Sequence, residues 1–326
     1  MSPLFLRRRT VLKLASLSSG AGWIGTTAAA ATAADLKGLQ LVVPTPAGSQ
    51  PDVIARWIID PLAQKASVPG LVLNLPGAAG ALAADAVLRG QPESGPRLLG
   101  GLDHVAYSHL QSNRRALDPM VDFVPVAAVN RDTWLVATAA DAPTRTLPAL
   151  AERARREPLN YPSTGEGSTA HLLSARLCKA MGIEAQHVPY RDPWMPDLIA
   201  GRVQFVVAPA PALLPQLRAG RLLALASLTD ERLPLPGDPP SIRALGMPDQ
   251  VFHGGLFLFA PAALAPLAAQ LNAWFREVVT AQDIRQRYQA ASIETVPLDL
   301  AGTAALVRQR LQQVDGMRLA VFGKSR

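Results

Sequence analysis

The sequence predicts an α/β protein built from two lobes. Short β-like runs alternate with helical patterns from residue 39 onward, and a second series of the same kind begins near Trp134. The 326 residues are enough for two domains, and 49% hydrophobic with 17% charged residues exclude a disordered chain. No flexible linker separates the two series, so we expect the chain to cross between the lobes at hinge strands.

The first series predicts a parallel sheet with helices on both faces, because each strand is followed by a helix. Residues 39–43 form a buried strand, and a Pro/Gly/Ser loop leads into a helix. One face of that helix carries the apolar residues Val53, Ile54, Trp57, Ile58 and Leu62. The elements that follow are strands at 71–75 and 97–102, a turn at 77–80 and a helix at 81–88.

The second series has predicted strands at 134–138, 186–188, 203–208 and 222–226, with helices at 147–156, 169–181 and 211–219. Four prolines in residues 233–240 indicate an extended surface loop, and residues 256–260 form a last strand. Three helices close the chain. The last has an apolar stripe that is too short for a coiled coil, so we expect it to pack on a sheet; its members are Leu300, Ala304, Val307, Leu311 and Val314.

The first 34 residues are typical of a cleavable export signal. Arg8, Arg9, Val11, Leu12 and Lys13 occupy the positions of a twin-arginine motif, and small residues at 28–34 allow cleavage after position 33 or 34. The stretch between is too weakly apolar for a membrane anchor. We therefore predict a periplasmic protein.

Charge and motif content exclude several function classes. Lys and Arg total 32 against 25 Asp and Glu, but four basic residues and no acidic ones lie in residues 1–34, so the remaining chain carries only +3. A nucleic-acid protein would need a clustered basic stripe. A single cysteine, Cys178, excludes an intramolecular disulfide and a multi-thiolate zinc site. The GxSxG, HExxH, GxxxxGK[ST] and GxGxxG motifs are absent, so we predict no enzyme activity, cofactor or metal.

Three loops rich in small residues follow predicted strands: the first loop (44–52, PTPAGSQPD), the second loop (161–169, YPSTGEGST) and the third loop (187–193, HVPYRDP). Each is expected to end at a helix N-terminus, where unpaired N–H groups and the helix dipole favour an anion. Glycine lets the backbone approach a ligand, and Ser and Thr add hydroxyl donors. The same composition also occurs in ordinary turns and caps, so both interpretations stay open for each loop.

Taken together and in order, several segments resemble the substrate-binding receptors of the tripartite tricarboxylate transporters, the Bug family. Residues 42–56 (VVPTPAGSQPDVIAR) look like the opening of the mature receptors. Their other signatures are matched at 74–80 (NLPGAAG), 122–125 (DFVP), 161–172 (YPSTGEGSTAHL), 187–191 (HVPYR) and 197–201 (DLIAG). The chain departs from the family pattern at Thr45, usually an aromatic residue, and at Ser49, usually a glycine.

The resemblance implies a periplasmic binding protein type II-like fold, two α/β lobes joined by a crossing hinge. We expect lobe 1 at 35–131 and 254–326 and lobe 2 at 132–253. It further implies capture of a small carboxylate in the interlobe cleft and delivery to membrane permease subunits by a monomer. A sensor subunit that presents its ligand to a signalling system, or an exported enzyme, are the alternatives.

The resemblance also implies the ligand-binding residues. They are Thr45, Ala47, Gly48, Ser49, Gln50 and Asp52 in the first loop, Ser163, Thr164, Gly165, Gly167, Ser168 and Thr169 in the second, and Tyr190 and Arg191 in the third. Asp52 is expected to fix the first loop, and His171 to support the second loop rather than touch the ligand.

Overall fold

The computed structural model describes residues 36–77, 80–90, 95–101, 117–190, 193–291 and 293–323. The predicted export signal, its twin-arginine motif and its cleavage position lie outside these residues, as does Arg191. Across the described ranges, no helix combines the length and the apolar character needed to span a membrane.

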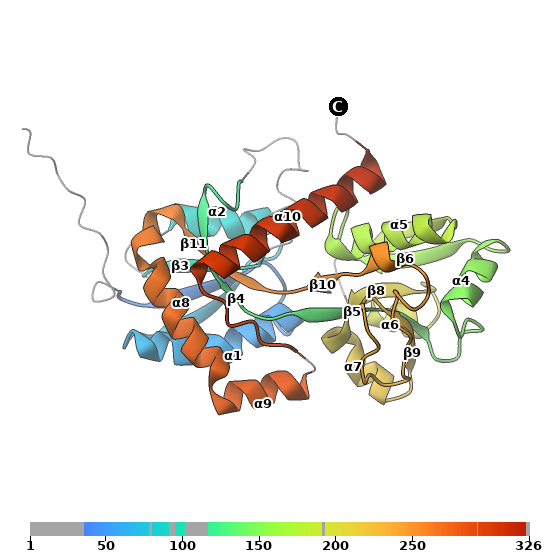
Figure 1. Cartoon of the computed structure of the whole chain (residues 1–326), viewed down its shortest axis with the longest axis horizontal. Helices are drawn as coiled ribbons and strands as arrows, with labels where there is room; N and C mark the ends of the chain where they lie inside the picture. The colour runs from blue at the N-terminus through green and yellow to red at the C-terminus, as the bar shows by residue number, and fades with distance from the viewer. Residues whose placement is uncertain are drawn as a thin grey trace, which may run out of the picture. The chain divides into compact units, whose positions relative to one another are not determined.

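The first lobe is built on a five-stranded sheet in the order β2-β1-β3-β11-β4, of which Figure 1 labels β3, β11 and β4. The apolar run LQLVV is buried at all five positions, as expected for a central strand covered on both faces. The strands are β1 (Leu39–Val43), β2 (Gly70–Asn74), β3 (Arg97–Gly100), β4 (Phe123–Ala128) and β11 (Phe257–Pro261).

Helices cover both faces of this sheet. One core contains Ile58 of α1, Leu271 of α8 and Tyr288 of α9, and the core on the opposite face contains Val87 of α2 and Val307 of α10. The helices are α1 (Gln50–Lys65), α2 (Ala81–Arg89), α8 (Ala265–Thr280), α9 (Gln282–Ala290) and α10 (Leu300–Phe322).

The second lobe has two sheets. Its strands are β5 (Asp132–Ala139), which pairs with β8 (Val206–Pro209), β9 (Leu222–Ser227) and β10 (His253–Gly254), and β6 (Leu159–Ser163), which pairs with β7 (Ala185–Pro189). Its helices are α4 (Leu147–Ala154), α5 (Thr169–Met181), α6 (Met195–Ile199) and α7 (Ala210–Arg218), with short 3₁₀ turns at η5 (Pro248–Gln250) and, in the first lobe, η6 (Ala262–Leu264).

Strand directions confirm the parallel sheet predicted for the first series and add antiparallel strands to it. β1 runs parallel to β2 and β3, and β6 runs parallel to β7, as helical crossovers require. β11, however, runs antiparallel to β3 and β4, and β5 is antiparallel to β8, β9 and β10. β11 and β5 each enter their lobe from the other lobe, and both run in the opposite direction to their neighbouring strands.

One local prediction also needs correction, and a second needs an addition. The strand expected at 203–208 begins only at Val206, although Val203 and Phe205 are buried beside it. The predicted stripe of α10 does pack against the cores, through buried Val307 and Val314 and partly buried Leu300 and Leu311. The helix also buries residues outside the stripe, namely Thr303, Arg310 and Met317.

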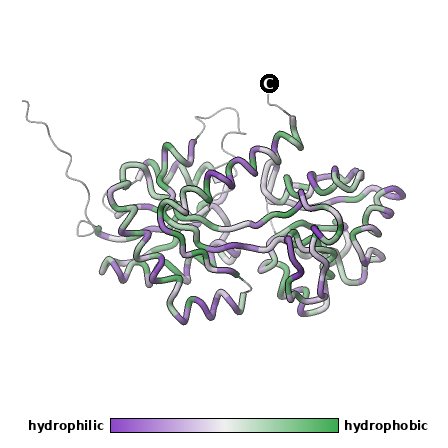
Figure 2. Tube along the Cα trace, in the orientation of Figure 1, coloured by the Kyte–Doolittle hydropathy of each residue, from purple (hydrophilic) through white to green (hydrophobic). Residues whose placement is uncertain are grey.

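Helix α10 belongs to the cores of both lobes. Val307 packs in the first lobe, and Val314 and Met317 pack in the second. Hydrophilic and hydrophobic residues are interspersed along its length (Figure 2). The hinge therefore has three parts: the crossing segment from β4 to β5, the crossing segment from β10 to β11, and helix α10.

Candidate functional site

The first loop runs from the end of β1 into α1. Gly48 has a φ of +81°, a left-handed conformation that favours glycine, and an added Cβ would meet nothing within 4 Å. Ser49 is the N-cap residue of α1 but makes no side-chain cap; its hydroxyl instead shares a 2.6 Å hydrogen bond with that of Thr45. Ala47 and Gly48 are exposed at the tip of the loop.

Asp52 organises this loop from beneath, with only 2% of its surface exposed. The Gly48 N–H donates to Oδ2 at 2.8 Å, the Arg56 Nε–H donates to the same oxygen at 3.1 Å, and the Asn74 amide donates to Oδ1 at 2.9 Å. The Asn74 amide also donates to the Thr45 carbonyl oxygen at 3.0 Å. The Asp52 carboxylate therefore holds the backbone of Gly48 directly and that of Thr45 through the Asn74 amide.

The charge of Asp52 is stabilised in this position. Burial by itself would raise the pKa of the carboxyl, but the hydrogen bonds from Arg56, Gly48 and Asn74 and the positive charge of Arg56 outweigh it, so the pKa is lowered. Asp52 is therefore ionised at neutral pH and acts only as an acceptor.

The second loop joins β6 to α5. Gly165 and Gly167 have φ values of +136° and +76°, which let the chain reverse above the helix. Ser168 is the N-cap residue of α5, and its hydroxyl accepts from the His171 N–H at 3.4 Å. The Ser163 hydroxyl, 1% exposed as a residue, bonds to both the N–H and the carbonyl oxygen of Gly165, at 3.0 and 2.9 Å.

The third loop is tied to the second. The Tyr190 N–H donates to the Ser163 carbonyl oxygen at 2.8 Å. The Tyr190 hydroxyl donates to Oδ2 of Asp197 at 2.6 Å, and Arg202 pairs with the same carboxylate. This hydroxyl is thus engaged within the lobe.

The first two loops contain no lysine or arginine. Besides the side chains of Gln50, Asp52 and Glu166, the two loops carry backbone N–H groups beside positive-φ glycines and the hydroxyls of Ser and Thr. Such groups donate hydrogen bonds to carboxylate oxygens, and bonds to a charged partner contribute about 1.5–3 kcal/mol each. The arrangement suits recognition of a small anion, and the described residues hold no group of three side chains that could ligate a metal.

The first loop connects to the hinge through Gln50. Its amide donates to Oδ1 of Asp132 at 2.9 Å, and the Asn130 amide donates to the same oxygen. Asn130 also accepts the Leu256 N–H at 3.1 Å, and the Val129 N–H donates to the Leu256 carbonyl oxygen at 2.7 Å. Both crossing segments are therefore bonded to each other and, through Asp132, to the start of α1.

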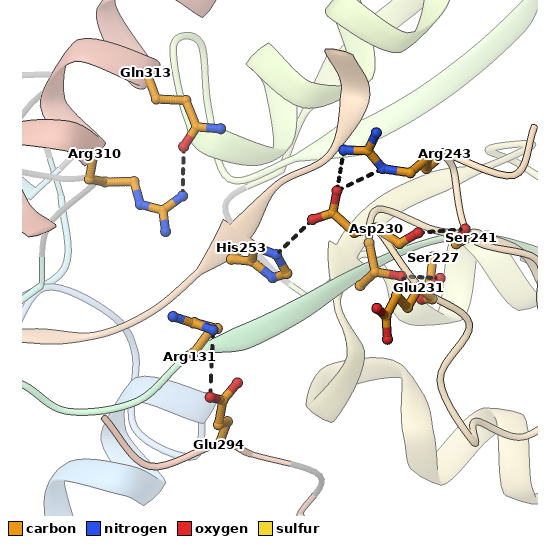
Figure 3. A network of polar contacts seen from close by, with 11 residues as sticks. Arg131, Ser227, Asp230, Glu231, Ser241, Arg243, His253, Glu294, Arg310 and Gln313 are labelled. Atoms are coloured by element: carbon orange, nitrogen blue, oxygen red, sulfur yellow. Dashed lines mark hydrogen bonds and ion pairs between the residues drawn. The ribbon is translucent and has the colours of Figure 1, made fainter. Parts of the chain in front are cut away.

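A groove of about 710 Å³ lies at the hinge, lined by Arg131, His253, Asp230 and Glu294 among others. Figure 3 shows these groups pairing: His253 Nε2 lies 3.8 Å from Asp230, and Arg131 lies 3.5 Å from Glu294. Burial, followed by the charges of Arg131 and Arg310, lowers the pKa of His253. None of the three loops lines this groove or a second cavity of about 400 Å³. Opposite charges already pair with one another in the groove.

Several supporting residues were missed by sequence reasoning. Asn74 reaches the first loop because β2 lies beside β1 with Val43 opposite Asn74, a register that the sequence does not reveal. Arg56 could have been found, since it lies four residues after Asp52 on one helix. His187 was noted only as part of the third loop, yet its ring stacks on that of His171.

Comparison with known proteins identifies the family. Residues 54–317 match the model of the tripartite tricarboxylate transporter family receptor. A UPF0065 protein encoded between tcbD and tcbE in Pseudomonas sp. strain P51 is 29% identical over 78% of this chain and 77% of its own. BugT of Bordetella pertussis is 26% identical over 86% and 87%. The structure of MatC from Rhodopseudomonas palustris with bound malate superposes with a TM-score of 0.76 at 25% identity, covering 86% of this chain and 98% of MatC.

Proposed function

Because the chain belongs to the tripartite tricarboxylate transporter receptors of the Bug family, we propose that it captures a small mono- or dicarboxylate for membrane permease subunits. It binds the anion without chemistry on it. The observation that carries this proposal is the pair of lysine- and arginine-free loops, each bent by positive-φ glycines and held in place by a buried side chain, Asp52 in the first and Ser163 in the second. The malate bound by MatC supports the ligand class.

In this proposal the first and second loops face each other across an interlobe cleft, with lobes at 35–131 plus 254–326 and at 132–253. Ligand contacts come from the tips of both loops, and the third loop adds Arg191. Asp52 supports rather than contacts the anion. A ligand that touches both lobes favours the closed arrangement by its extra affinity for that state.

We further propose that residues 1–34 are removed after twin-arginine export and that the mature protein is a monomer. Mass spectrometry of the periplasmic fraction would show a chain beginning at Ala34 or Asp35. Replacing both Arg8 and Arg9 with lysine should leave the protein in the cytoplasm; normal export of that variant would contradict the proposal.

Thermal melting against a panel of organic acids tests the function directly. Ligand present at 100 times its dissociation constant adds about 2.7 kcal/mol to the free energy of unfolding, a shift easily detected. The proposal fails if no carboxylate, amino acid or aromatic acid raises the melting temperature of the folded protein. A stoichiometric metal or bound chromophore would instead favour the exported enzyme, and neighbouring genes for a sensor kinase rather than a permease would favour the sensor subunit.

A further inference from the structure

Two histidines from different elements of the second lobe stack beneath the second loop. His171 lies in the first turn of α5 and His187 in β7; their ring centroids are 3.8 Å apart and their planes differ by 7°. The Tyr161 ring of β6 flanks both, at 6.2 and 5.6 Å. Only 7% of His171 is exposed. This close stacking holds both imidazoles in one orientation.

Each imidazole holds a different part of the second loop. The Gly167 N–H donates to Nδ1 of His171 at 3.0 Å. Nε2 of His187 shares a 2.6 Å hydrogen bond with the Ser163 hydroxyl, which bonds in turn to both backbone groups of Gly165. The two positive-φ glycines that shape the loop therefore depend on the histidine pair.

The bond to the loop requires His171 to be neutral. A proton on Nδ1 of His171 would place an N–H group opposite the Gly167 N–H, so the hydrogen bond would be lost. The charged imidazole would also stack directly on the ring of His187. Tyr161 faces the pair from β6, and Glu166, on the loop, is the charged group that acts on His187. Burial, and then the neighbouring His187, lower the pKa of His171 to about 4, and burial lowers that of His187 despite Glu166.

The last turn of α10 also contacts this pair. The uncharged ring of Phe322 meets His171 edge-on, with centroids 5.4 Å apart and planes at 69°. α10 starts in the core of the first lobe, with Val307, and reaches α5 in the second, as Figure 1 shows. The last turn of α10, a helix shared by both lobes, thus contacts the histidine pair that supports the second loop.

We propose that the stacked His171 and His187 are positioning residues that hold the second loop in its anion-binding conformation and release it when the pair takes up a proton. The proposal rests on the proposed function, because it takes the second loop as part of the ligand site. It assigns the two histidines a role in ligand release under acidic conditions, without contact to the ligand.

The first test needs no ligand. Nuclear magnetic resonance of the purified protein follows the Gly165 and Gly167 amides and the imidazole of His171 from pH 7 to pH 4. We expect the Gly167 amide and the imidazole to shift with one midpoint. In His171→Asn the amide oxygen replaces Nδ1 as acceptor but does not titrate, so the Gly167 signal should stay constant. The same Gly167 titration in H171N as in the wild type would overturn the proposal. H253Q, at the hinge, is the matched control and should titrate like the wild type.

The second test measures malate affinity by calorimetry. At pH 7, H171F keeps a ring but loses the acceptor and should bind at least tenfold more weakly, whereas H171N should stay within about threefold of the wild type. Near pH 4 half of the protein molecules carry a proton on the histidine pair. The malate affinity of the wild type should therefore fall about twofold more than that of the H171N/H187Q double variant. Protonation of malate itself affects both proteins equally. An equal loss of malate affinity in both proteins overturns the proposal. If the wild type binds no malate at any pH, malate is not a ligand, and the resonance titration then decides whether the histidine pair holds the second loop.

Discussion

Replacing Asp52 with asparagine tests how the first loop is held. The three groups around this carboxylate, the Gly48 N–H, the Asn74 amide and the Arg56 guanidinium, are all donors. An asparagine amide keeps one acceptor oxygen but turns an NH₂ group toward a donor in either orientation. The change also removes the negative charge opposite Arg56.

The size of the effect follows from these contacts. One charge-assisted hydrogen bond is lost and an N–H group is left facing another donor in a buried position, which together cost about 2–3 kcal/mol of unfolding free energy. A change of 1 kcal/mol moves the melting temperature by about 2–4 °C in a domain of 150–250 residues. We therefore expect D52N to melt about 4–12 °C below the wild type at pH 7.

Thermal denaturation followed by circular dichroism measures this shift, and Asp60→Asn, an exposed position on the same helix, is the matched control. Because the pKa of Asp52 is lowered by folding, its contribution is present above the pKa of an unfolded Asp, about 3.9, and disappears as pH falls through the folded value. The difference between D52N and the wild type should shrink below about pH 4. Melting of D52N together with D60N at pH 7, or a difference that does not change with pH, would refute this account of the loop.

Three further predictions concern the hinge, α10 and the core. Gly255→Ala places a methyl group 2.3 Å from the Asn130 carbonyl oxygen where the crossing segments meet, so urea denaturation should show a loss of about 1–3 kcal/mol; an unchanged midpoint would contradict the close approach. Gly316→Ala adds a methyl group in open space within α10 and should raise stability by about 0.5–1 kcal/mol, and any loss would count against the helical assignment there. Cys178 is 6% exposed and burial raises its pKa to about 12, so a thiol reagent should modify it only after denaturant is added; rapid labelling of the native protein would disprove its burial.

Much of the local structure could be predicted because its causes lie within a few residues. The apolar run of β1 matches the predicted strand at 39–43, and α5 spans the predicted 169–181. α5 begins after the Ser168 cap and ends before Gly182, whose φ of +62° suits a left-handed C-cap. The type of α/β fold and the family resemblance followed from such local patterns and their order, and the comparisons confirm both. The three loops as a binding site stay a prediction.

Contacts between residues far apart in the sequence decided how the strands are arranged and how the first loop is joined to the hinge. Gln50 meets Asp132 across 82 residues, and Asn130 meets Leu256 across 126. Which strands are neighbours, and in which direction they run, depends on how the two lobes share their crossing segments, a property of the whole chain.

The sequence by itself determined the approximate places of most strands, helices and glycine-rich loops, because hydrophobic periodicity, caps and turns act over one or two turns of chain. Only the tertiary structure decided that Asn74 reaches the first loop and that His187 stacks on His171. Those contacts depend on strand register, which arises when separate elements pack against one another and leaves no mark at either position in the sequence.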